Sequence, residues 1–187
     1  VTVTAGSYTV TSTSNGCTSA PVNVTINAQP VTPAVPTVSP VTHPTCSVAT
    51  GSFTITNYNA TNTYTFVPAG PTIDASGVVT ASTGSYTLTA SANGCTSASV
   101  SVTVNAQPAT PATPTIGSVT QPTCSVANGT FVITNYSSAN TYSITSPTGT
   151  VVSGPTATGL VTVTAGSYTV TSTSNGCTSA PVVVGIN

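Results

Sequence analysis

The sequence is built from repeats, and this feature limits the possible folds more than any other. Residues 1–27 read VTVTAGSYTVTSTSNGCTSAPVNVTIN, and residues 161–187 return the same sequence with two changes. Between these copies, a stretch that begins Pro-Thr-Cys-Ser-Val at Pro44 returns at Pro122. Self-similarity with a period of roughly 80 residues predicts a tandem array of small structural units rather than one large domain.

Short proline-rich stretches separate the repeats. Asn27 and Asn105 are both followed by Ala-Gln-Pro, and proline then recurs at every third position. This spacing matches the period of a polyproline II helix and predicts semi-rigid, extended joints, the alternative being a docking site for a proline-binding domain. The boundaries predict a truncated repeat at 1–27, a linker at 28–36, a repeat at 37–105, a linker at 106–114 and a repeat at 115–187. Because the sequence stops where a linker begins in the other copies, we expect it to be a window from a longer polymer.

The residues between the turn signals favour strands. Val and Thr dominate, and both are β-branched, which suits a pleated surface better than a helix. No segment shows apolar residues at helical spacing over ten residues. In the first complete repeat we predict strands at about 37–43, 51–57, 62–67, 77–81, 84–92 and 97–105.

The strand at 84–92 has two different faces. Tyr86, Leu88 and Ala90 fall on one side, and Ser85, Thr87 and Thr89 fall on the other. Such alternation is typical of an antiparallel strand with an apolar inner face and a hydroxyl-bearing outer face. The sister strand repeats the pattern, with Tyr168 and Val170 inside and Thr169 outside. Several such strands at this spacing predict an all-β fold of tandem antiparallel β-sandwiches joined by short linkers.

Each complete repeat contains two cysteines. A domain this small buries only about 60% of its unfolded surface and often needs a covalent staple. We therefore predict the disulfides Cys46–Cys95 and Cys124–Cys177. Each would close a loop of about 50 residues and contribute about 4 kcal/mol in the chain-entropy model. Disulfides imply an oxidising, extracellular compartment.

The fifth cysteine, Cys17, matches the second cysteine of its repeat, so its partner is expected upstream of Val1. The alternatives to disulfides are buried free thiols and a metal site. Two cysteines per repeat without a repeated histidine do not supply the four ligands of a tetrahedral site.

Charged residues are almost absent. The sequence has no Lys and no Arg, Asp74 is its only acidic residue and His43 its only histidine. A chain without basic residues is not expected to bind nucleic acid, and without a stretch of about 18 apolar residues it is not expected to insert into a membrane. Acid–base catalysis, glycoside hydrolysis and hard-cation binding all need groups that this sequence lacks. We predict that the protein is not an enzyme and has no cofactor or metal site.

The motifs at both ends of each repeat resemble a known family. The motif positions in the first complete repeat are Cys46, Gly51, Phe53, Ile55, Gly84, Tyr86, Leu88, Asn93, Gly94 and Cys95. Those in the second are Cys124, Gly129, Phe131, Ile133, Gly166, Tyr168, Val170, Asn175, Gly176 and Cys177. This pattern resembles the Ig-like repeats of giant Bacteroidota cell-surface adhesins, including those of the gliding-motility adhesin. The resemblance implies Ig-like sandwiches in a long stalk that is exported to the bacterial surface.

Together these features predict structural spacer repeats of a secreted bacterial surface adhesin or extracellular fibre. Its expected partners are neighbouring repeats of the same chain, together with other fibres laterally or surface glycans. The alternative is a carbohydrate- or ice-binding module that uses its threonine-rich strand faces, such as the one that carries Thr87 and Thr169.

Overall fold

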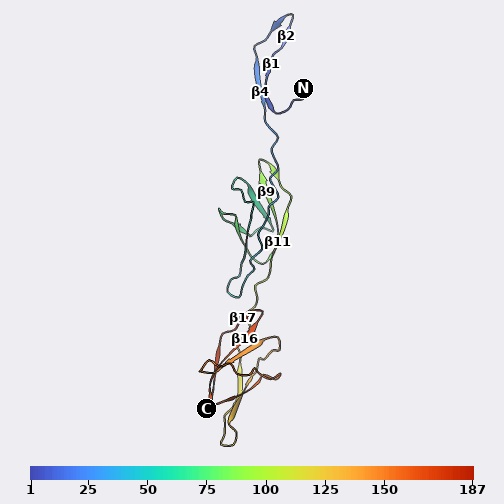
Figure 1. Cartoon of the computed structure of the whole chain (residues 1–187). Coiled ribbons are helices and arrows are strands. Elements are labelled where there is room, and N and C mark those ends of the chain that lie inside the picture. The colour runs from blue at the N-terminus through green and yellow to red at the C-terminus, as the bar shows by residue number, and fades with distance from the viewer. The chain divides into compact units, whose positions relative to one another are not determined.

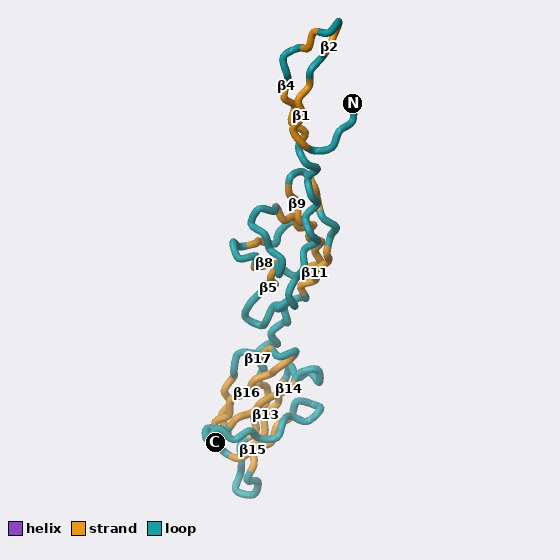
Figure 2. Tube along the Cα trace, turned by 45° about the horizontal axis from the view of Figure 1, so that its top comes forward, coloured by secondary structure: helices purple, strands orange, loops and turns teal.

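The computed structural model describes every residue from Val1 to Asn187. Its regular secondary structure consists of strands alone, β1 to β18, as Figures 1 and 2 show. The predicted all-β fold class is therefore confirmed. No helix long and apolar enough to cross a membrane is present.

The chain forms two compact units. The first unit comprises Val1–Val41, Ser52–Ala81 and Ser85–Thr103. The second comprises Thr42–Gly51, Ser82–Gly84 and Val104–Asn187. One loop of the first repeat, Thr42–Gly51, thus belongs by its contacts to the unit that contains the whole second repeat.

Two antiparallel sheets make up the second unit. The smaller sheet has the order β12-β13-β15, and the larger sheet has β14 and β18 on β16, which also pairs with β17. The strands of the smaller sheet are β12 (Ile116–Thr120), β13 (Asn128–Ile133) and β15 (Leu160–Thr164). Those of the larger sheet are β14 (Thr141–Thr145), β16 (Gly166–Ser174), β17 (Cys177–Thr178) and β18 (Val182–Ile186).

The core of the second unit lies between these sheets. Side chains from both sheets form one buried cluster, so the sheets pack face to face as a sandwich. The cluster consists of Phe131, Ile133, Ile144, Val161, Val163, Tyr168, Val170, Val184 and Ile186. Tyr168 also donates its hydroxyl hydrogen to the backbone oxygen of Thr164 at 3.0 Å, which satisfies its one polar group.

Replacing Phe131 by Ala is expected to destabilise the second unit by about 3–5 kcal/mol, because the ring is completely buried and its removal leaves a cavity. The measurement is urea denaturation followed by tyrosine fluorescence. Val183→Ala is the matched control: Val183 is 65% exposed, so its change is expected to stay within about 0.5 kcal/mol. Equal shifts for both variants would contradict the assigned core.

The first unit has the same pair of sheets. The smaller sheet has the order β5-β8-β7, and in the larger sheet β9 pairs with β6, β10 and β11. Its strands are β5 (Gly51–Thr54), β6 (Thr63–Val67), β7 (Thr72–Ile73), β8 (Val78–Ala81), β9 (Gly84–Ala92), β10 (Cys95–Thr96) and β11 (Val100–Val104). Phe53 of one sheet meets Phe66 of the other edge to face, with ring centroids 6.5 Å apart. The predicted alternation of β9 is confirmed, since Tyr86, Leu88 and Ala90 are buried while Ser85 and Thr87 are exposed.

The strand predicted at 37–43 is wrong for the first repeat. This stretch contains only single-residue bridges, at Val38 and Thr42, whereas its sister stretch forms the strand β12. Pro40 stands where β12 has Ser118. Proline lacks the backbone N–H that a strand needs for its ladder, so the regular pairing is interrupted there.

The N-terminal copy of the repeat shows where burial comes from. Residues 1–27 form β1 (Gly6–Val10), β2 (Thr13–Ser14), β3 (Cys17–Thr18) and β4 (Val22–Ile26). Strands β1 and β4 pair in the same register as β16 and β18. Yet Val10 is 56% exposed, while its sister Val170 is completely buried. The nearly identical sequence is buried in one copy because β13, β14 and β15 cover it, so residues 1–27 supply only part of a sandwich.

Both linkers lack regular secondary structure but are held at their ends. The side-chain amide of Asn135 donates to the backbone oxygen of Thr113 at 2.9 Å and accepts from the amide of Thr115 at 2.8 Å. Asn57 makes the same pair of bonds to Val35 and Thr37, each at 2.9 Å. The proline between the two bonded residues is buried in each case. The last residues of each linker are therefore held against the repeat that follows.

Candidate functional site at the disulfide

A tight turn presents the second cysteine of each repeat. The turns at Asn93-Gly94 and Asn175-Gly176 have positive φ at both residues, 50° and 79° in the first and 49° and 78° in the second. Asn-Gly is the preferred pair for such hairpin turns because both residues tolerate this conformation. The cysteine follows directly as the first residue of β10 or β17. The turn thus fixes the cysteine at the tip of a hairpin.

A second kind of loop presents the first cysteine. In the first repeat, Thr45 and Val48 exchange backbone hydrogen bonds of 2.9 and 3.3 Å, which closes a tight loop around Cys46. Thr123 and Val126 do the same around Cys124, at 2.9 and 3.2 Å. Both cysteines are exposed. Each repeat therefore offers one cysteine on a loop and one on a hairpin.

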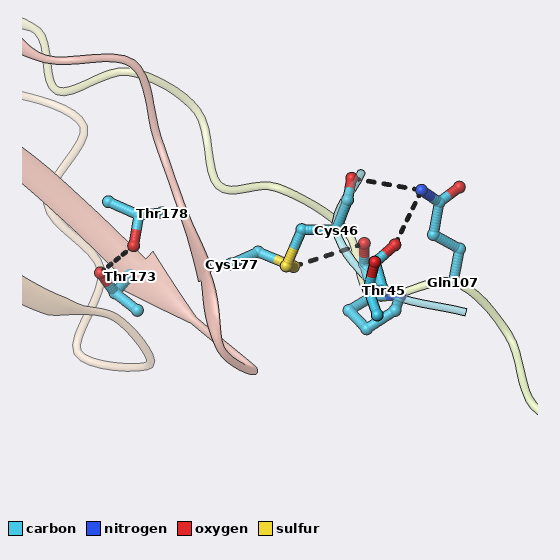
Figure 3. Close-up of a disulfide and its surroundings, with 7 residues drawn as sticks. Thr45, Cys46, Gln107, Thr173, Cys177 and Thr178 are labelled. Atoms are coloured by element: carbon cyan, nitrogen blue, oxygen red, sulfur yellow. Dashed lines mark hydrogen bonds between the residues drawn. A yellow bond between two sulfur atoms is a disulfide. The ribbon is translucent and has the colours of Figure 1, made fainter. Parts of the chain in front are cut away.

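The structure contains one disulfide, between Cys46 and Cys177, shown in Figure 3. Their Cα atoms are 5.5 Å apart, which is within the usual range for a disulfide. The bond joins the loop of the first repeat to the hairpin of the second across 131 residues of sequence. Cys177 is completely buried, whereas Cys46 stays exposed.

The linker between the repeats packs around this bond. The side-chain amide of Gln107 donates to the backbone oxygens of Thr45 at 3.0 Å and Cys46 at 3.2 Å (Figure 3). The sulfur of Cys177 lies 3.6 Å from the backbone oxygen of Pro108. The loop, the linker and the hairpin thus form one site within the second unit.

The predicted pairings Cys46–Cys95 and Cys124–Cys177 are wrong. Cys46 bonds to Cys177, and the cysteines at 17, 95 and 124 are free thiols. The reason is the geometry of β16, which separates the loop that carries Cys124 from the hairpin of Cys177. That loop precedes Asn128, which pairs with Thr164 beside the start of β16, whereas Cys177 follows its end. The eight steps between its nine residues, at about 3.3 Å each, span roughly 26 Å, far beyond the reach of a disulfide. The upstream partner expected for Cys17 stays a prediction.

The only histidine and the only acidic residue both bind backbone groups. His43 is exposed, and its Nδ1 accepts the backbone N–H of Asn105 at 3.2 Å. The sister residue Gln121 does the same with its Oε1, which accepts from the backbone of Asn187 at 2.6 Å. Asp74 accepts from the backbone amides of Ser76 and Val78, at 2.8 and 2.9 Å, in the turn between β7 and β8. Asp74 thus stabilises this turn.

The outer faces carry hydroxyl groups that bond to one another. At the base of the hairpin, Thr173 and Thr178 lie 2.9 Å apart between their hydroxyl oxygens. The equivalent pairs, Ser91 with Thr96 and Thr13 with Thr18, have the same distance. Cross-strand hydroxyl pairs of this kind stabilise a sheet without any charge. Thr87 and Thr169, farther along the strands, are exposed as predicted.

Replacing Gln107 by Ala is expected to make the Cys46–Cys177 bond easier to reduce. The loss of two exposed hydrogen bonds to the loop should cost about 0.7 kcal/mol, which shifts the equilibrium with glutathione by roughly threefold. The fraction of reduced protein is measured by alkylating the free thiols and recording the mass of the protein by mass spectrometry. Gln29→Ala is the matched control, because Gln29 holds the same linker position and is exposed. A shift of the same size in the control would contradict a specific role for Gln107.

Comparison with known proteins adds little beyond the fold class. No family model and no curated protein matches this sequence. Among solved structures, a mouse coronavirus receptor-binding domain with its murine receptor is 9% identical over 74% of this chain and 92% of that chain, with a TM-score of 0.43. The FN1–FN3 domains of chicken CNTN1 are 12% identical over 96% and 76% of the two chains, with a TM-score of 0.35. The BSP domain of a biofilm-associated protein is 15% identical over 80% and 29%, with a TM-score of 0.28. Scores this low do not bear on function.

Proposed function

We propose that the chain is a spacer segment of a secreted bacterial surface adhesin or extracellular fibre and that it is not an enzyme. The observation that carries this proposal is the Cys46–Cys177 bond, which ties a loop of one repeat to the next repeat. A disulfide forms and persists in oxidising compartments such as the cell exterior. A covalent tie between copies suits a segment whose task is to transmit tension.

The surface of the chain supports the same role. Its only acidic residue and its only histidine are both engaged in hydrogen bonds to the backbone, so neither is poised for acid–base chemistry. The absence of Lys and Arg leaves no site for trypsin-like proteases. Near-zero net charge also favours association between molecules, which would allow fibres to bundle.

Deletion of two repeats tests the proposal. Removing residues 28–187 in frame from the polypeptide that contains this chain takes out two repeats with their linkers and leaves the register of the array intact, because residues 1–27 and 161–187 are nearly identical. A spacer is expected to give a shorter fibre that still adheres when it is exported. Normal export with complete loss of adhesion would overturn the spacer role.

A binding role for the threonine face is the second candidate. The favouring observation is the exposure of Thr87 and Thr169 at matched positions of β9 and β16. The double variant Thr87→Val and Thr169→Val keeps the β-branched shape and removes the hydroxyls. Binding to a glycan array or to ice that disappears in this variant would support the second candidate. Unchanged adhesion would argue against it.

A further inference from the structure

Each complete repeat leaves one cysteine free, Cys95 in the first and Cys124 in the second. We propose that each is one end of a disulfide to another copy of the repeat. When a copy follows in tandem, Cys124 bonds to the hairpin cysteine of that copy. When a copy precedes, Cys95 bonds to the loop cysteine of that copy. The loop cysteine of one repeat thus always pairs with the hairpin cysteine of the next, as Cys46 pairs with Cys177.

The hairpin half of this site is built in the first repeat as it is in the second. The sulfur of Cys95 lies 3.8 Å from the backbone oxygen of Pro30, and the sulfur of Cys177 lies 3.6 Å from that of Pro108. Pro30 and Pro108 hold the same position in the two linkers. Cys95 therefore stands against its linker in the pose that Cys177 has in the bonded site.

The loop half is also built twice. Cys124 lies in a loop closed by the same two backbone hydrogen bonds as the loop of Cys46. The side chain that precedes each loop, His43 or Gln121, accepts the backbone N–H of the asparagine that follows the last strand of the repeat. This bond holds the loop beside the start of the outgoing linker. The loop of Cys124 is thus placed where the next repeat would begin.

Burial differs between the two hairpin cysteines. The bonded Cys177 is completely buried, whereas the free Cys95 is half-buried. The loop cysteines Cys46 and Cys124 are both exposed. A thiol that solvent can reach is available to an oxidant. The reaction consumes two thiols and one disulfide oxidant such as glutathione disulfide. The new S–S bond takes the place of two S–H bonds, and the two electrons and two protons reduce the oxidant to two thiols.

An extended chain tests the pairing. The 187-residue chain is continued after Asn187 by a second copy of residues 28–187, which restores the Asn-Ala-Gln-Pro junction. Serine replaces every cysteine except Cys46, Cys124 and Cys177 of the first copy and Cys95 of the second. Four cysteines allow three pairings. The peptides that carry Cys124 and the second-copy Cys95 have the same composition, so the pairings are distinguished by the fragment ions of the disulfide-linked chymotryptic peptides. The protein is refolded with glutathione and glutathione disulfide, and remaining thiols are alkylated.

The expected result is a peptide that joins Cys124 to the second-copy Cys95, together with Cys46–Cys177 and complete loss of alkylation. A control in which the second-copy Cys95 is also changed to Ser is expected to restore alkylation at Cys124 alone. A Cys124–Cys177 bond, or alkylated Cys124 in molecules that contain Cys46–Cys177, overturns the proposal. The 187-residue chain provides a second test that does not depend on the folding of the extended chain. A Cys46–Cys95 bond in the 187-residue chain overturns the proposal as well.

Discussion

Stretched by its two ends under oxidising conditions, the chain is expected to stop extending well short of its full length. The Cys46–Cys177 bond shortens the load-bearing path by 131 residues. At about 3.5 Å per extended residue, the enclosed length is roughly 450 Å. Adding a thiol reductant is expected to release this length in one step. Single-molecule force spectroscopy measures it directly.

Two variants sharpen this measurement. The double variant Cys46→Ser and Cys177→Ser is expected to reach full length without reductant. Cys95→Ser, which removes a free thiol, is expected to behave like the unaltered chain. Two separate releases of about 180 Å each would instead indicate one disulfide within each repeat, because each such loop would hold about 50 residues.

Loss of the same bond is expected to lower the stability of the second unit by up to about 5 kcal/mol. Cross-linking residues 131 positions apart removes much of the freedom of the unfolded chain, and the chain-entropy model gives about this value. The double variant Cys46→Ser and Cys177→Ser is compared with the oxidised chain by urea denaturation. Free thiols are alkylated first in both proteins, so that no other disulfide forms during unfolding.

Cys124→Ser is the matched control for stability, because Cys124 lies on the sister loop and has no partner in this chain. Its urea midpoint is expected to equal that of the unaltered protein. A loss of several kcal/mol in Cys124→Ser, with none in the double variant, would show that the assigned pairing is wrong.

The repeats, the strands and the inner faces could be predicted from the sequence because they depend on local patterns. The alternation around Tyr86 and Tyr168 places both rings in the core, as expected. The short strands β7 and β10 escaped prediction because two residues carry too little pattern. The interrupted strand at Pro40 could have been recognised, since proline is unsuited to a paired strand.

The pairing of the cysteines could not be predicted from their number in each repeat. Two cysteines in each repeat suggested one bond in each repeat, but pairing depends on distance rather than on number. Cys177 comes directly after an Asn-Gly turn at the end of the nine-residue strand β16, while Cys124 lies before Asn128, whose partner Thr164 stands just before the start of β16. Cysteines at opposite ends of β16 cannot meet. Which loop covers Cys177 depends on the neighbouring repeat and needed the three-dimensional structure.

The unequal exposure of the two bonded cysteines determines which sulfur a reducing thiolate attacks. An incoming thiolate can approach Cys46, which faces solvent, but not Cys177, which is sealed. The attacking group therefore becomes attached to Cys46, and Cys177 departs as the leaving thiolate. Because the Cys177 thiolate is released beside the newly formed mixed disulfide, it can attack Cys46, displace the reductant and restore the Cys46–Cys177 bond. A brief exposure to reductant is thus repaired by the protein itself.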